Sequence, residues 1–166
     1  MLDYPVLLLF PAAMAFAAVM DVFTMTIPNR ISLALIAGFC VAAPLAGLSL
    51  HDTLMHVAAF AVVLAGGIFL FSMRLLGGGD AKLMATASLW VGFDHLLPFF
   101  LGVTILGGFL ALGMILLRRV PITVIPGYEW ALRLHKGESG MPYGVAIAGG
   151  GLWVYPTTAI FKALVA

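Results

Sequence analysis

The chain has 166 residues, of which 63% are hydrophobic and only 9% are charged. An ordinary soluble domain has about 25% charged residues, so this composition excludes a soluble globular protein, and the high apolar content excludes a disordered polar chain. The net charge of +1 provides no basic face for nucleic acid, and the single cysteine excludes a disulfide framework or a multi-thiolate zinc site. We therefore expect a polytopic membrane protein whose surroundings are the lipid bilayer, without a metal ion, a cofactor or a nucleic-acid partner.

Six apolar runs follow one another along the chain, separated by short polar segments. At about 20 residues per membrane crossing, the length leaves room for six helices and short loops but no extramembrane domain. We therefore predict one all-α domain over residues 1–166 with six transmembrane helices. The runs are Leu2 to Met20, Ile31 to Leu50, Leu54 to Met73, Leu83 to Phe93, Leu96 to Leu117 and Met141 to Phe161.

The fourth run is too short for an ordinary membrane crossing, which needs about 17 to 25 residues. If it crosses, it must recruit the glycine-rich segment before it, and this draws Asp80 below the membrane surface. Each glycine weakens a helix by about 1 kcal/mol relative to alanine, so Gly77, Gly78 and Gly79 predict either an unwound start of the fourth helix or a backbone that other groups approach closely. A flexible turn is the alternative, but non-helical backbone inside a membrane is tolerated only where it lines a cavity or is buried in protein.

The basic residues predict the orientation in the membrane. Seven of the eight follow the first, third and fifth runs, whereas the opposite side has Lys162 alone. By the positive-inside rule, both termini lie outside the cytoplasm, and Asp21 and Asp80 share the cytoplasmic side with a loop at about 118–140. That loop is either an interfacial amphipathic helix or an ordinary cytoplasmic loop. The seven residues are Arg30, Arg74, Lys82, Arg118, Arg119, Arg133 and Lys136.

Asp21 ends the first apolar run, and Ala13 and Ala17 precede it at four-residue spacing, on the same helical face. Small residues favour close helix packing, so we predict that this face points into the bundle. Periodicity alone leaves Asp21 either functional or a helix-end charge. Asp80 is the stronger candidate, because a turn does not need a carboxylate inside the bilayer, where an aspartate costs a few kcal/mol.

Two aspartates on one membrane face, with glycines beside one of them, are what an aspartic protease dyad requires. Like charges held close together cannot both ionise readily, so one carboxyl keeps its proton while the other activates water. The protonated carboxyl hydrogen-bonds the developing oxyanion and later helps to protonate the leaving amine. The glycines at residues 77–79 would let an extended substrate strand pair with exposed backbone groups.

Three motifs in this order resemble the type IV prepilin peptidase family, specifically its minimal TadV/CpaA branch serving Flp-type pili. They are Asp21 followed by Ile27-Pro28-Asn29, then Gly77-Gly78-Gly79-Asp80-Ala81-Lys82-Leu83, and then Pro142-Tyr143-Gly144 to Ala148. The resemblance implies a six-helix aspartic protease of the bacterial inner membrane, with Asp21 and Asp80 as catalytic residues. It also implies prepilin and pseudopilin substrates, cleaved on the cytoplasmic side just before their hydrophobic helix. Larger relatives carry paired CxxC motifs and methylate the new N-terminus, which is not expected of this chain.

The remaining motif residues are candidates for substrate binding or support of the dyad. Pro28 is expected to cap the second helix, and Asn29 to be a cap or a polar neighbour of the aspartates. Lys82 is expected to reach the headgroups, with an aspartate or substrate contact as the alternative. Tyr143, between Pro142 and Gly144, is either an interface anchor or a hydrogen-bond donor to the dyad or the substrate.

Two other functions fit paired carboxylates in a membrane. A proton-coupled transporter would use them to relay protons, although such proteins favour midplane sites on broken helices related by internal repeats. A non-enzymatic subunit of a secretion machine would use them only for hydrogen bonds between helices.

Overall fold

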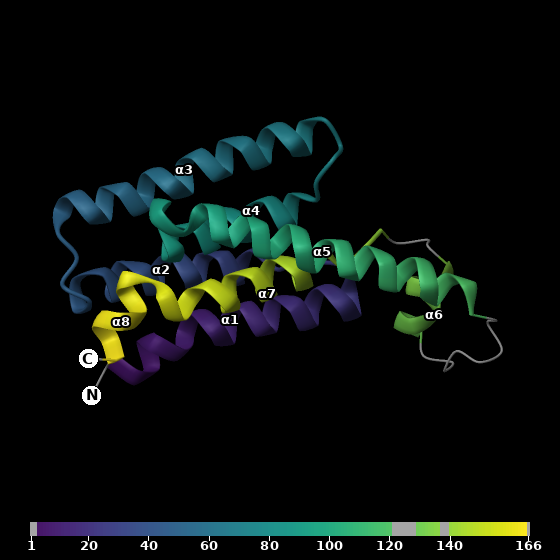
Figure 1. Cartoon of the computed structure of the whole chain (residues 1–166), viewed down its shortest axis with the longest axis horizontal. Coiled ribbons are helices and arrows are strands. Elements are labelled where there is room, and N and C mark those ends of the chain that lie inside the picture. Colours follow the sequence, from purple (N-terminus) through teal and green to yellow (C-terminus); the bar gives the residue numbers. More distant parts are fainter. Residues whose placement is uncertain (1–2, 121–128, 137–139, 166) are drawn as a thin grey trace.

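The computed structural model describes residues 3–120, 129–136 and 140–165, and within these ranges the chain forms helices, turns and loops with no strand (Figure 1). Short 3-10 turns at Phe93–His95 and Tyr155–Thr157 lead into α5 and α8. The all-α prediction is therefore confirmed for the described residues. The helices are α1 (Asp3–Thr24), α2 (Asn29–Leu45), α3 (Leu50–Ser72), α4 (Gly78–Val91), α5 (Leu96–Arg119), α6 (Glu129–Lys136), α7 (Tyr143–Val154) and α8 (Ala159–Val165).

The short helix α4 lies in the middle of the bundle, packed against α2, α3 and α7. Every residue from Leu83 to Val91 is buried, and a helix that is apolar on all sides is a core element. The indole Nε1 of Trp90 donates a hydrogen bond of 2.9 Å to the Leu35 carbonyl, which ties α4 to α2. Because α4 is covered by protein, its length of 14 residues does not have to match the thickness of a bilayer.

Three helices are long and apolar enough to cross a membrane: Tyr4–Thr24, Leu50–Ser72 and Phe93–Arg119. The segments Tyr143–Thr157 and Ala159–Val165 form a fourth candidate together, bent by 56° at Thr158. Many large apolar side chains on these helices are exposed, as lipid contact requires. The structure thus supports three or four spans in the described residues, and the count of six remains a prediction.

The glycine-rich start of α4 is more regular than the sequence predicts. Gly77 alone is extended, with φ −69° and ψ 143°, and the helix already begins at Gly78, so the predicted unwinding is wrong for Gly78 and Gly79. Both glycines instead permit close packing, as the second alternative predicts. A Cβ at Gly78 would lie 3.4 Å from the Phe71 ring, and one at Gly79 would lie 3.2 Å from the Ile27 Cβ.

The two ends of the bundle differ as the charge distribution predicts. The N- and C-termini lie together at one end, and the polar end of α5 and helix α6 lie at the other (Figure 1). Of the predicted loop at 118–140, residues 121–128 and 137–139 lie outside the described residues, and the rest includes α6. An edge-on contact of 5.3 Å between the Phe23 and Trp130 ring centres joins α1 to α6. The orientation in the membrane remains a prediction.

Candidate active site

Asp21 lies in the last turn of α1 and is only 5% exposed. Ala17, one turn earlier, is fully buried, so the prediction that this face points into the bundle is confirmed. Oδ2 of Asp21 accepts a hydrogen bond of 2.7 Å from the backbone N–H of Gly144, at the start of α7. Hydrogen bonds to a charged acceptor are about twice as strong as neutral ones, and a helix N-terminus favours negative charge.

Gly144 has no room for a side chain. A Cβ at this position would lie 2.8 Å from Oδ2 of Asp21 and 2.9 Å from Cδ1 of Ile27. The glycine therefore has two roles: its N–H holds the carboxylate, and its missing side chain lets α7 approach α1. The sequence placed Gly144 among the supporting residues but gave no sign that it contacts Asp21, 123 positions away.

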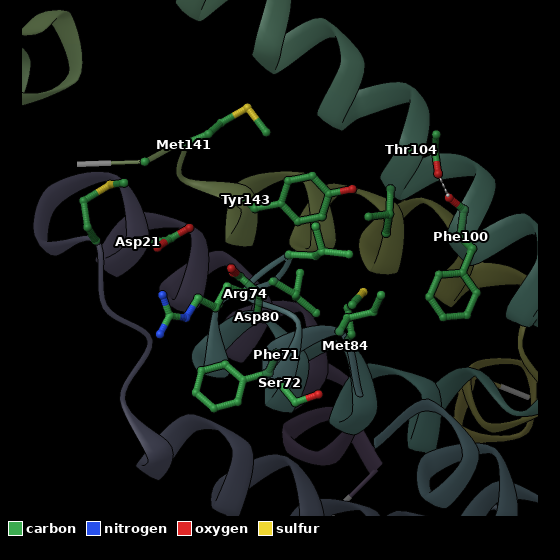
Figure 2. Close-up of a pocket in the computed structure, with 17 residues that line it drawn as sticks. Asp21, Phe71, Ser72, Arg74, Asp80, Met84, Phe100, Thr104, Met141 and Tyr143 are labelled. Carbon is green, nitrogen blue, oxygen red and sulfur yellow. Dashed lines mark hydrogen bonds between the residues drawn. The ribbon is translucent and has the colours of Figure 1, made fainter. Parts of the chain in front are cut away.

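Asp80 lies in the first turn of α4, and its carboxylate lies against Gly77, where a Cβ would be 2.6 Å from Oδ2 of Asp80. Asp80 and Asp21 interact electrostatically and both line one open cavity of about 1250 Å³. Figure 2 shows the two carboxyl groups turned toward this shared space. The structure thus brings together the two aspartates that the sequence predicted to be catalytic.

Two residues of the cavity wall have a backbone conformation that side chains rarely adopt. Met25 has φ 53° and Arg74 has φ 59°, both in the left-handed region. Such conformations cost about 1 to 3 kcal/mol each and cluster at functional sites, where the surrounding structure enforces them. Figure 2 shows Arg74 among the residues that line the cavity with Asp80. Sequence reasoning missed both residues, because nothing in a single sequence marks a left-handed methionine or arginine.

Tyr143 also lines the cavity, but its hydroxyl group points toward α5 (Figure 2). The ring fills a notch at Gly107, where a Cβ would lie 2.9 Å from the ring and 3.3 Å from the hydroxyl oxygen. Among the described residues, no hydrogen bond joins this hydroxyl to either aspartate. The structure therefore does not show a bond from Tyr143 to the dyad, whereas a bond from this hydroxyl to the substrate stays a prediction. The side chain packs α7 against α5.

Gly77 also lines the cavity, whereas Pro28, Asn29, Lys82 and Pro142 are not among its lining residues. Pro28 occupies the N-cap position of α2, as predicted, but Asn29 is the first helical residue, so its predicted capping role is wrong. The Asn29 Oδ1 instead accepts a hydrogen bond of 2.9 Å from Nζ of Lys82, which ties the start of α2 to the start of α4. Pro142 is buried at the N-cap position of α7.

The two carboxyl groups line one open cavity, and that of Asp21 is held by the backbone N–H of Gly144. In the described part of the chain, no group of three or more histidine, cysteine, aspartate or glutamate side chains is arranged to hold a metal ion. A pair of carboxyl groups in one cavity can act as general acid and general base.

The sequence profile described as the type IV leader peptidase family matches residues 8–112. The chain belongs to the type IV leader peptidase family. No curated protein and no solved structure was found to match it. As a member of this family the chain is a peptidase, and its apolar helices are those of a membrane protein. The matched range contains both aspartates, whereas Gly144 lies beyond it and joins the site through its hydrogen bond to Asp21.

Proposed function

We propose that this leader peptidase is a membrane-embedded aspartic endopeptidase that cleaves Flp-like prepilins and pseudopilins of the TadV/CpaA type of system. Cleavage would occur at the cytoplasmic face of the bacterial inner membrane, with Asp21 and Asp80 as the catalytic residues. The observation that carries the proposal is the shared cavity: two aspartates from separate helices line one open space and interact electrostatically.

The reaction needs one ionised and one protonated carboxyl group. The ionised carboxylate accepts a proton from water as the water oxygen attacks the scissile carbonyl carbon. The protonated carboxyl group hydrogen-bonds the oxygen that becomes negatively charged. When the C–N bond breaks, the leaving nitrogen takes up a proton from the pair, and the product carboxylate and amine leave the site. Because the two groups share a proton, they titrate as a unit.

The position of the pair favours a peptidase over a transporter. Asp21 is three residues from the end of α1, about 4.5 Å along the helix axis, and Asp80 is in the first turn of α4. Transporter sites lie near the bilayer midplane, whereas a cut next to a hydrophobic helix requires carboxylates near a membrane surface. A purely structural pair would have no need of an open cavity between its members.

The test is incubation of the purified protein in detergent with a synthetic pilin precursor, followed by mass measurement. We expect one cut, directly before the hydrophobic segment, and no cut with the Asp80→Asn variant. An intact precursor after incubation with the parent protein would overturn the proposed function. Cleavage by Asp80→Asn at the parent rate would overturn the role of Asp80.

A further inference from the structure

The active-site cavity continues sideways, between α3 and α5. Helix α3 packs chiefly on α4, and α5 packs chiefly on α7, whereas α3 and α5 share no extensive interface in the described residues. The cavity is lined on one side by Leu70, Phe71 and Ser72 of α3 and on the other by Phe100, Val103 and Thr104 of α5. Met84 of α4 forms part of its floor. We call this extension the α3–α5 groove.

Most of the side chains that line the groove are apolar. Met84 follows Asp80 by one helical turn, about 6 Å deeper along α4. Figure 2 shows Met84 and Phe100 on the side of the cavity away from Asp21, with the Thr104 side chain between α5 and the open space. The Thr104 hydroxyl group is satisfied by a hydrogen bond of 2.7 Å to the Phe100 carbonyl, so the wall presents no unmet donor there.

The groove differs from the lipid-facing surface because it leads to the reacting groups. Its walls come from two helices long enough to cross a membrane and include Leu70 and Phe71, which are 37% and 55% exposed. The cavity volume of about 1250 Å³ exceeds the 300–1000 Å³ that is usual for small-ligand sites. A polymeric substrate with an apolar part fits such a site better than a small molecule.

The substrate class in the proposed function has an apolar helix directly after the scissile bond. That helix cannot leave the bilayer without exposing its apolar side chains to water, so it must approach the carboxylates from within the membrane. On the side of the bundle between α3 and α5, the groove offers such a path, continuous with the site. Resting on the proposed function, we propose that the α3–α5 groove is the lateral entrance and docking site for the apolar helix of the substrate.

A crosslinking experiment tests the location without requiring catalysis. In an Asp80→Asn, Cys40→Ala background, Thr104→Cys places a thiol in the groove, and Ile105→Cys places one at a similar depth outside the cavity lining, on a residue that is 51% exposed. The probe is a synthetic precursor with one cysteine in the first turns of its apolar segment. We expect a disulfide-linked product with Thr104→Cys and little with Ile105→Cys.

Equal crosslinking at both positions, or no crosslinking at Thr104→Cys, would overturn the proposal that the groove is the docking site. The groove would then be a space filled by lipid. The crosslinking result does not decide the proposed function, which is tested separately by cleavage of the precursor by the parent protein. A parent that cleaves together with a groove that does not crosslink rejects only the docking proposal. A groove that crosslinks together with a parent that does not cleave rejects only the peptidase reaction on this precursor.

A kinetic comparison gives a second, independent measurement. Thr104→Trp fills part of the groove, so kcat/KM for the full precursor should fall relative to that for a short peptide that spans the scissile bond but lacks most of the apolar helix. We expect this ratio to fall by about tenfold or more, the usual size of a steric effect in an apolar pocket. Ile105→Trp should keep the ratio of the parent. An equal loss on both substrates with Thr104→Trp would refute docking of the helix in the groove.

Discussion

The contact between Gly144 and Asp21 makes Gly144→Ala the sharpest single test of the site. The added methyl group would lie 2.8 Å from Oδ2 of Asp21 and 3.1 Å from its Cβ. A carbon and an oxygen atom normally approach no closer than about 3.3 Å, so the carboxylate must move by about 0.5 Å. That movement weakens the 2.7 Å hydrogen bond from the Gly144 N–H, which fixes the carboxylate in place.

The expected loss follows from these distances. A misplacement of about 1 Å costs about a hundredfold in rate, so we expect kcat/KM for the pilin precursor to fall between about tenfold and a hundredfold. Alanine also raises helix propensity by up to about 1 kcal/mol, so the thermal midpoint should change little. Gly108→Ala is the matched control, because a Cβ there meets nothing within 4 Å. Parent-like cleavage by Gly144→Ala would refute the role assigned to this glycine.

Two further predictions concern catalysis and topology. Asp21→Asn and Asp80→Asn should each abolish cleavage. The thermal midpoint of each variant in detergent should stay the same or rise, because inactivating substitutions commonly relieve active-site strain. A variant that is inactive only because it unfolds would contradict the catalytic assignment. For topology, Asp52→Cys and Arg119→Cys in a Cys40→Ala background should react with an impermeant thiol reagent from the outer and the cytoplasmic side respectively. Labelling of both from the same side would show that the predicted orientation is wrong.

Much of the site could be predicted from the sequence because its chemistry depends on residues that are conspicuous in an apolar chain. An aspartate at the end of an uninterrupted apolar run, on the face of Ala17, has few explanations in a membrane. Three glycines before Asp80 are equally conspicuous. Both residues do line one cavity.

The supporting contacts could not be predicted, because they join segments that are far apart in the chain. The spacing of motifs does not show that Gly144 donates to Asp21, nor that Lys82 bonds to Asn29. Three glycines in a row predict either unwound or closely approached backbone, and Gly78 and Gly79 are helical but closely approached by neighbouring side chains. A glycine that weakens a helix and a glycine that makes room for a neighbouring side chain look the same in a sequence. Only the residues packed around the glycine distinguish the two roles.

Arithmetic on the apolar runs predicts six membrane crossings, of which the described residues support three or four, so the count of six stays a prediction. That arithmetic assumes that each apolar run is long because a bilayer requires it. Helix α4 is apolar for a different reason, since it is enclosed by α2, α3 and α7, and its buried length extends only from Ala81 to Val91. An enclosed helix can begin below the ends of its neighbours, and this allows the aspartate in its first turn to meet a carboxylate from another helix.

One side chain connects the three sequence motifs in space. Ile27, between Asp21 and Pro28 in the first motif, lies 3.2 Å from the Cβ position of Gly79 and 2.9 Å from that of Gly144. The starts of α4 and α7 therefore both pack on the same residue of the α1–α2 loop. Since Asp80 follows Gly79 directly, and Gly144 donates to Asp21, the packing around Ile27 sets the relative position of the two carboxylates. Glycine at both contact points is what allows three separate segments to meet closely enough to form one site.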